Sequence, residues 1–443
     1  MLTSLCLVAV CHLASGTDIP EMPVWYTSKT PYPEPLYTVY PEPPAGFSLI
    51  NIQHVARHGS RGLSSRDADD LLMQVWLQAQ YEQALTPLGL QLGADLMEIL
   101  RIHHDIGYGQ LSGLGRTEHK AQAARLLERI VDASALEDLE REIHVIHSGR
   151  SRAIDSGTAF IDGWLQLRPQ DESRFLEPVA DEHTVYFHSA EGSEGYADYR
   201  RGERVQQVLS YYESLEQTED VARAIVEALF TKDFIQRLDG GAYWFVALDD
   251  DSDVIESSFD VAMAVYDLFS IAINLTEEYA PDFLAYVPEE TRMWLAFIDD
   301  ADSFYGRGPG FADETISFEL AGNLVSDMLA RTNAVAQGES TEFATVRFTH
   351  AQALMPIAAW LEFPDAHQGA DPAVPFSYEN NPWRAARVAP MASNVQWDVF
   401  QNGDGEVLVR VLWNERIAPL GRGCEAYFEG FYRLEELNRC LGS

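Results

Sequence analysis

In the stretch Arg57-His58-Gly59-Ser60-Arg61 a histidine stands between two arginines. Residues 47–55, just before it, alternate apolar and polar side chains, which predicts a strand. The motif therefore follows the C-terminal end of a strand, where open α/β sheets bind their ligands. Positive charge on both sides disfavours a protonated imidazole, so we expect the histidine to stay neutral. A neutral imidazole can attack a phosphorus atom whose oxygens the arginines hold, so the motif predicts an enzyme that forms phosphohistidine.

Two further predicted strands end in residues of the same chemistry. Residues 143–147 predict a buried strand, and Arg152 comes just before a helix predicted over 153–164. Residues 344–349 predict a third strand, which His350 follows directly. We expect the three strand ends to converge, as the carboxyl ends of parallel strands do. The cluster expected there consists of Arg57, His58, Arg61, Arg152 and His350.

The order of the predicted elements divides the chain into a core with one long insertion. A helix is expected from Thr86, which suits an N-cap before a proline, and a second helix from about residue 116. The stretch 168–333 has helical periodicity without regular alternation of strand and helix, which predicts an inserted helical domain. Strands over 394–400 and 407–412 flank Asn402-Gly-Asp-Gly405 and predict a hairpin. The divisions we expect are an extended arm over 17–44, an α/β core over 45–167 and 334–443, and the α-helical insertion over 168–333.

Composition restricts the partners of the chain. Its 443 residues can bury a large core, and its formal net charge is -38. Such a charge makes nucleic acid and anionic membrane surfaces unfavourable partners. Lysine occurs only at Lys29, Lys120 and Lys232, so nearly all of the 31 basic residues are arginine. A saline habitat and codon bias in an acidic proteome explain this composition equally well. We expect a small anionic ligand, held where arginines cluster locally.

An apolar run at the start of the chain predicts export. Residues 5–11 are apolar and Ala14-Ser-Gly16 offers a small-residue cleavage site, which together resemble a secretory signal over 1–16. The positively charged start of such a signal is missing, and a mis-assigned start codon is the alternative. No later segment approaches the ~20 apolar residues of a membrane span, so we expect no membrane insertion. Cys424 and Cys440 remain as an even pair, which favours a disulfide in a secreted or periplasmic protein.

These motifs resemble those of the histidine acid phosphatases, and among them the multiple inositol polyphosphate phosphatases, which act on phytate. The resemblance covers most of residues 45–165 and 343–440. Supporting stretches are Leu85-Thr-Pro-Leu-Gly89, Gly113-Leu-Gly-Arg-Thr-Glu-His119, Pro390-Met-Ala-Ser-Asn-Val-Gln-Trp397 and Arg410-Val-Leu-Trp-Asn-Glu415. The fold we expect is α/β, a three-layer sandwich phosphatase core with an inserted, mostly α-helical domain and the substrate in the cleft between them.

The resemblance also implies roles for the clustered residues. His58 would be the nucleophile, and His350 would complete the phosphate pocket. Arg57, Arg61 and Arg152 would clamp the phosphoryl oxygens, as planar guanidiniums bind two oxygens each. We expect no metal or other cofactor, because the arginines already neutralise the phosphate and no metal-ligand set is visible. The histidines expected to be structural are His54, His103, His104, His144 and His147.

One residue departs from the pattern of the family. Where the inositol polyphosphate phosphatases have His-Ala-Glu, with the acid protonating the leaving alkoxide, this chain has His350-Ala-Gln352. An amide cannot surrender a proton, and general acid catalysis is usually worth about 10²–10⁴ in rate. Another carboxylate can reach in from the helical insertion, the enzyme can be slow and rely on water, or the chain can be a phosphate-binding relic. We expect hydrolysis of inositol polyphosphates such as phytate, with a general acid phosphatase and a weakly active or inactive pseudophosphatase as alternatives.

Overall fold

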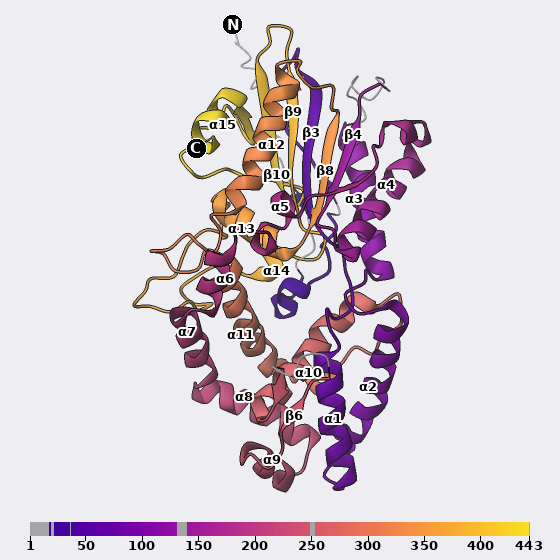
Figure 1. Cartoon of the computed structure of the whole chain (residues 1–443), viewed down its shortest axis with the longest axis vertical. Helices are drawn as coiled ribbons and strands as arrows, with labels where there is room; N and C mark the ends of the chain where they lie inside the picture. The colour runs from indigo at the N-terminus through magenta and orange to yellow at the C-terminus, as the bar shows by residue number, and fades with distance from the viewer. Residues whose placement is uncertain (1–16, 19–21, 36, 131–139, 249–252, 443) are drawn as a thin grey trace, which may run out of the picture.

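A mixed sheet of eight strands forms the centre of the structure, which is a computed structural model (Figure 1). The described residues are 17–18, 22–35, 37–130, 140–248 and 253–442, so the expected signal over 1–16 lies outside them. The strand order is β11-β10-β9-β3-β8-β4-β5, with β12 beside β10. The strands are β3 (Ser48–Arg57), β4 (Ile143–His147), β5 (Val179–Ala180), β8 (Ala344–Thr349), β9 (Asn394–Gln401), β10 (Val407–Trp413), β11 (Arg416–Ile417) and β12 (Phe431–Arg433).

The direction of the central strands decides where the site lies. Strand β3 runs parallel to β8 and antiparallel to β9, and β4 runs parallel to β8. Arg57 pairs with Thr349, and His147 pairs with Phe348, so β3, β8 and β4 all end at one edge of the sheet. The three predicted strands are confirmed, and so is the hairpin of β9 and β10.

Helices cover both faces of this sheet, which confirms the three-layer sandwich (Figure 1). On one face, α3 (Gly113–Ile130) and α4 (Ser151–Leu167) bury Phe160 and Trp164 against the sheet. On the other face lie α5 (Glu182–Val185), α12 (Ala321–Ala336) and α13 (Ala351–Trp360). Helix α3 begins one turn before the predicted start at residue 116, because the Ser112 hydroxyl accepts the Gly115 backbone N–H at 3.2 Å.

A second lobe, which we call the helical lobe, lies below the edge where β3, β8 and β4 end (Figure 1). Its main helices share one hydrophobic core: α1 (Asp67–Tyr81), α2 (Pro87–Ile106), α8 (Glu216–Leu229), α9 (Lys232–Asp239), α10 (Ser258–Ala272) and α11 (Glu289–Arg307). The chain therefore enters this lobe twice, before β4 and again after β5. The predicted cap of α2 is confirmed, since the Thr86 hydroxyl accepts the Gly89 N–H at 3.0 Å. Smaller elements are α6 (Glu194–Arg201), α7 (Glu203–Glu213), β6 (Phe245–Val246), β7 (Val254–Ile255), α14 (Ala385–Val388) and α15 (Leu434–Leu441).

One helix corrects an expectation about membranes. The window Ser258–Leu275, which covers α10, is long and apolar enough to span a membrane by length and composition alone. The expectation that no segment after the N-terminal apolar run approaches the length of a membrane span is therefore wrong. However, 67% of this window is buried inside the protein, as is usual for the core helix of a globular lobe.

The two ends of the described chain are tied to the core. Cys424 and Cys440 form the expected disulfide, with Cα atoms 5.4 Å apart. In the N-terminal arm, β1 (Thr17–Asp18) pairs with β2 (Tyr37–Thr38), and a 3₁₀ helix η1 (Val24–Lys29) lies between the sheet and the helical lobe (Figure 1).

Candidate active site

Strand ends and helix starts bring the predicted site residues together. The His58 backbone N–H donates to the Thr349 carbonyl at 2.8 Å, which joins the ends of β3 and β8. The rings of His58 and His350 are 5.3 Å apart between centroids. Arg152 lies in the first turn of α4, and its charge acts on both histidines. The sheet thus gathers His58, His350 and the three arginines, which we call the phosphate arginines: Arg57, Arg61 and Arg152.

The His58 ring is buried and neutral. Burial lowers its pKa well below 6.5, and the charges of Arg57, Arg152 and Arg61 lower that pKa further. Its Nδ1 atom lies 2.9 Å from the Gly59 carbonyl oxygen. A carbonyl can only accept, so Nδ1 carries the proton and Nε2 keeps the lone pair. The ring therefore presents a nucleophilic nitrogen at Nε2.

The glycine of the motif is required by close packing. A Cβ atom on Gly59 would lie 2.5 Å from the Gly115 carbonyl oxygen, in the first turn of α3. Next to it, Glu118 accepts the Ser60 backbone N–H at 2.6 Å and the Ser60 hydroxyl at 2.8 Å. The start of α3 thus fixes the backbone of the loop that carries the nucleophile.

The phosphate arginines hold unused hydrogen-bond donors. The Nε atom of each is buried and has no hydrogen-bond partner in the described structure. Arg57 is anchored by Nη1, which donates to the Ala389 carbonyl at 2.7 Å and to the Ser28 carbonyl. Within the described residues, none of the three forms an ion pair with an acid, whereas most other arginines of the chain do. Such a set of unpaired donors is suited to bind an anion.

The pKa values of these arginines show that the site has excess positive charge. Burial and, after it, the charge of Arg152 lower the pKa of Arg61 to about 9. Burial, followed by the charges of Arg61 and Arg152, lowers the pKa of Arg57 well below its ordinary value. A bound phosphate would relieve this repulsion, because it supplies the missing negative charge.

The second histidine is held by a serine from the end of β4. His350 is the N-cap residue of α13, and its Nε2 atom lies 2.8 Å from the Ser148 hydroxyl oxygen. That oxygen also accepts the Arg150 backbone N–H at 3.4 Å, so its own hydrogen is free to point at Nε2. The proton of the ring then sits on Nδ1, which is buried without a partner. His350 can therefore donate one hydrogen bond to a bound anion.

Gln352 lies in the first turn of α13 and is half-buried. The charged groups with the largest effects on the pKa of His58 and His350 are all arginines or histidine, with no carboxylate among them. Two carboxylates act on the phosphate arginines instead. They are Glu118, which acts on Arg57, and Asp267 of α10, which acts on Arg61.

Only the second of these carboxylates is accessible. Glu118 is buried, and its oxygens accept hydrogen bonds from Ser60 and from the Tyr32 backbone. The side chain of Asp267 is 37% exposed and lies 2.9 Å from the Lys29 ammonium group. The helical lobe therefore brings one solvent-facing carboxylate toward the site.

Several residues of the site carry no signal in the sequence. Tyr186 places its ring 4.4 Å from the His350 ring. Arg307, at the end of α11, adds another positive charge that acts on Arg57. Ser148 and Tyr186 are ordinary residue types in unremarkable positions of the chain, and Glu118 lies in a stretch that supports the family resemblance but has no predicted role there. Only the three-dimensional arrangement could identify them.

Other histidines have structural contacts. The His54 ring stacks on Phe160 at 5.4 Å, and burial lowers its pKa to about 4. His103 is buried, with Nδ1 2.6 Å from Asp69. Among the described residues there is no group of three or more His, Cys, Asp or Glu side chains arranged to hold a metal ion.

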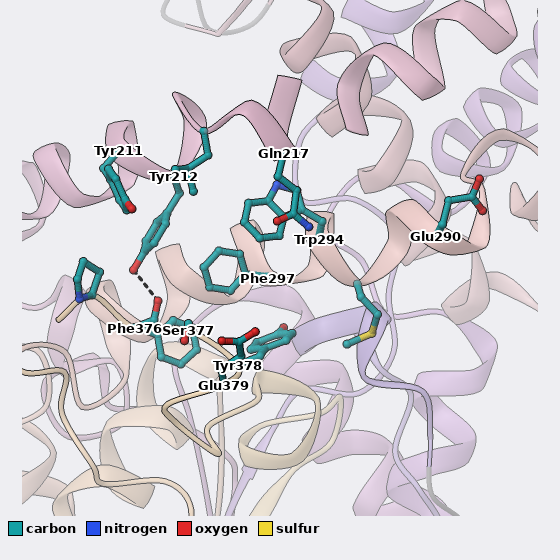
Figure 2. Close-up of a pocket in the computed structure, with 13 residues that line it drawn as sticks. Tyr211, Tyr212, Gln217, Glu290, Trp294, Phe297, Phe376, Ser377, Tyr378 and Glu379 are labelled. Atoms are coloured by element: carbon teal, nitrogen blue, oxygen red, sulfur yellow. Dashed lines mark hydrogen bonds between the residues drawn. The ribbon is translucent and has the colours of Figure 1, made fainter. Parts of the chain in front are cut away.

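A cavity elsewhere in the structure has a different character. It has a volume of about 470 Å³ and lies between α7, α8, α11 and the loop 375–379. Figure 2 shows aromatic side chains around it, with the Tyr212 hydroxyl donating to the Phe376 carbonyl at 2.8 Å. Its lining contains neither lysine nor arginine and includes Glu290 and Glu379, so it is unsuited to phosphate. The candidate phosphate site is therefore the cluster at the edge of the sheet.

A buried histidine of lowered pKa facing unpaired arginines at this edge is a candidate site for an anion. Residues 48–414 match the family model of the histidine phosphatase superfamily (branch 2), and the chain belongs to this superfamily.

Within this superfamily the chain is similar to the multiple inositol polyphosphate phosphatase of Bifidobacterium longum in complex with inositol hexasulfate. The identity is 26% and the TM-score is 0.88, with 95% of this chain and 97% of that chain covered. The family resemblance inferred from the motifs is thereby confirmed.

Two phytases share the fold at lower identity. The phytase from D. castellii is 13% identical with a TM-score of 0.64, covering 95% of this chain and 84% of that chain. The Hafnia alvei phytase in complex with myo-inositol hexakis sulphate is 13% identical with a TM-score of 0.53, covering 90% and 98%. A comparison with curated protein sequences finds no match.

Proposed function

We propose that this chain hydrolyses phosphomonoesters through a phosphohistidine on His58. The observation that carries this proposal is a buried, neutral imidazole surrounded by phosphate arginines that have no acidic partner. In the first step, the Nε2 lone pair attacks phosphorus, the P–O bond to the leaving alcohol breaks, and that alkoxide takes a proton. In the second step, water attacks phosphorus, the P–N bond breaks, and inorganic phosphate leaves.

The remaining groups act on the charge of the transferred phosphoryl group. Phosphoryl transfer places negative charge on three equatorial oxygens, so catalysis is mostly positioning and electrostatic stabilisation. The phosphate arginines hold these oxygens, and the Nδ1–H of His350 donates to one of them. All these donors are already oriented by the ends of β3, β8 and β4, so little reorganisation is needed during the reaction.

Inositol polyphosphates such as phytate are the substrates we propose. The similar B. longum phosphatase is in complex with inositol hexasulfate, which carries several anionic groups on one ring. A polyanion of this kind gains most from a dense group of cations. The chain carries a net charge of -38, so most of its surface repels an anion, and the group of arginines is the favoured binding site.

The leaving alkoxide needs a proton that Gln352 cannot supply. Asp267 is the carboxylate we propose for this step, because it is exposed and belongs to the helical lobe that faces the phosphate site. Direct contact is not required, since one water can relay a proton between a carboxylate and the leaving oxygen.

Trapping the phosphoenzyme tests the proposal. The protein is mixed rapidly with radiolabelled phytate, quenched, and digested, and acid-labile phosphate is mapped to a peptide. We expect label on His58, and we expect His58→Ala to lose label and more than about 10⁴-fold of phosphate release. Turnover of p-nitrophenyl phosphate at a rate equal to or above that of phytate would favour a general acid phosphatase. Absence of both label and phosphate release at every pH would leave a binding protein only.

We also propose that the protein works outside the cytoplasm. The Cys424–Cys440 disulfide supports this location, because such bonds persist in oxidising compartments. Sequencing the N-terminus of the protein recovered from the medium or periplasm tests it, with cleavage after about residue 16 expected. Retention of the intact chain inside the cell would contradict it.

A further inference from the structure

Arg150 is an arginine next to the phosphate site whose charge the proposed reaction does not use. It lies in the turn between β4 and α4 and is the N-cap residue of α4. Its guanidinium carbon is 5.7 Å from the centre of the Tyr186 ring, and the Tyr186 ring is 4.4 Å from the His350 ring. The guanidinium is therefore separated from the inner pocket by a single aromatic ring.

The electrostatic influence of Arg150 reaches the site. Burial and the phosphate arginines lower the pKa of His350, and the charge of Arg150 lowers it as well. Arg150 also lowers the pKa of Arg152. A cation that raises the positive potential of a buried site makes the folded protein less stable unless an anion is bound there.

Unlike most exposed arginines of the described structure, Arg150 has no acidic partner, a feature that it shares with Arg416. Arg101, for example, is exposed and forms ion pairs with Glu98 at 2.7 Å and Asp105 at 2.5 Å. For Arg150 the described structure contains no ion pair, although Glu182 comes close to the same turn at Gly149. Its guanidinium charge is therefore not neutralised by an acid within the described residues, although the chain has a net charge of -38.

The turn that carries Arg150 is well fixed. Gly149 has a φ of +77°, which only glycine adopts without strain, and its N–H donates to His147 Nδ1 at 3.1 Å. The Arg150 N–H is directed to the Ser148 hydroxyl. A cation–π contact with the face of the Tyr186 ring further restricts the position of the Arg150 guanidinium. The side chain is thus held at the rim of the pocket while its donors remain free.

We propose that Arg150 binds a second phosphate of a polyphosphorylated substrate, one that is not transferred in the same turnover. This inference rests on the proposed function and adds a determinant of substrate class to it. The inner phosphate is held by the phosphate arginines, so a donor outside Tyr186 can reach only a group further out on the same molecule. A monophosphorylated ester carries no such group and gains nothing from Arg150.

Kinetics with two substrates test this role. For Arg150→Gln, we expect kcat/KM for phytate to fall about tenfold, mostly through KM, because a charge-assisted contact to the bound substrate is lost. With p-nitrophenyl phosphate we expect a change of less than about twofold. Arg150→Lys keeps the charge and is expected to recover part of the phytate activity, since lysine binds phosphate as a point charge. The matched control is Arg101→Gln, which removes an exposed arginine that is already paired and should alter neither substrate.

Two results would overturn the inference. An equal loss with both substrates would place Arg150 on the transferred phosphate, and no loss with either would leave it without a role in binding. If the wild-type protein hydrolyses neither substrate, the proposed function fails, but the inference is still tested by calorimetry. Inositol hexasulfate should then bind Arg150→Gln about tenfold more weakly than the wild-type protein, while inorganic sulfate should bind both equally. Equal affinity of Arg150→Gln and the wild-type protein for inositol hexasulfate would reject the role of Arg150.

Discussion

The phosphate arginines and the Asp398 cluster are two groups of buried or half-buried arginines with opposite electrostatics. In the Asp398 cluster, Arg129 of α3 and Arg410 of β10 both donate to the carboxylate of Asp398 on β9, at 3.1 and 2.7 Å. Burial alone would raise the pKa of Asp398, but the two arginines outweigh it and hold that pKa below its ordinary value. At the phosphate site, by contrast, burial and mutual repulsion lower the pKa of the arginines themselves.

This difference separates a structural cluster from a binding site. Charge in the Asp398 cluster is balanced within the protein, so its arginines contribute to folding. Charge at the phosphate site is balanced only when an anion arrives, so these arginines are expected to oppose folding and favour ligand binding. Mutations in the Asp398 cluster should therefore lower stability and leave activity nearly unchanged, whereas mutations of the phosphate arginines should lower activity and leave stability nearly unchanged.

The largest stability effect is expected for Asp398→Asn. Removing this carboxylate leaves two buried guanidiniums without a counter-charge, which should lower the free energy of unfolding by about 3–5 kcal/mol. Chemical denaturation measures this change, and kcat of the folded fraction should stay within about twofold of the wild-type value. A loss of less than about 1 kcal/mol would show that the cluster is not structural.

The largest catalytic effect short of removing the nucleophile is expected for Arg152→Ala. Loss of one oriented donor to the phosphoryl group should lower kcat/KM by about 10²–10³. Arg152→Lys should not restore it fully, since an ammonium cannot bind two oxygens as the planar guanidinium does. Stability should be unchanged or slightly higher, because repulsion at the site is reduced. A variant that is both active and less stable would place Arg152 with the structural arginines.

Much of this arrangement could be predicted from the sequence, because buried strands and short motifs leave local signals. Strands β3, β4 and β8 were each expected from apolar runs, and the Arg57–Arg61 motif located the site at their ends. Helix α3 begins a turn before the predicted residue 116, because the Ser112 hydroxyl caps it.

What the sequence could not show depends on contacts between distant segments. Helices α1 and α2 have clear helical periodicity, but nothing local indicates that they pack with α8 and α10 rather than on the sheet. The same holds for Ser28, whose carbonyl anchors Arg57 from the N-terminal arm, and for Tyr186 beside His350. A motif names residues that touch the ligand, while the residues that hold them in place are set by tertiary packing.

A smaller effect on kcat is expected from the residue that donates the proton to the leaving alkoxide. If the phosphate site lacks a proton donor, Gln352→Glu should raise kcat about tenfold or more, toward the range of general acid catalysis. If Asp267 already serves, Gln352→Glu should change little and Asp267→Asn should lower kcat instead. Single-turnover measurement of phosphoenzyme formation from phytate distinguishes the two, because departure of the alkoxide in this step needs the proton donor. Glu98→Gln, on α2 of the helical lobe, is the control for removing an exposed carboxylate that pairs with arginine.

The last prediction is that the His58 ring does not take up a proton near pH 6.5. Burial and the phosphate arginines hold its pKa well below 6.5, so the ring should be neutral at pH 6.5, where an ordinary histidine is half protonated. NMR of the protein with isotope-labelled histidine measures this, with His58→Ala used to assign the signal. An apparent pKa near 6.5 would mean that the arginines do not act on the ring.

The lowered pKa of His58 also makes the stability of the protein depend on pH, since the unfolded chain binds a proton at this residue near pH 6.5 and the folded chain does not. His58 therefore contributes stability above that pH and loses it as the pH falls toward the lowered folded pKa, whereas Asp398 retains its contribution until the pH falls below about 4.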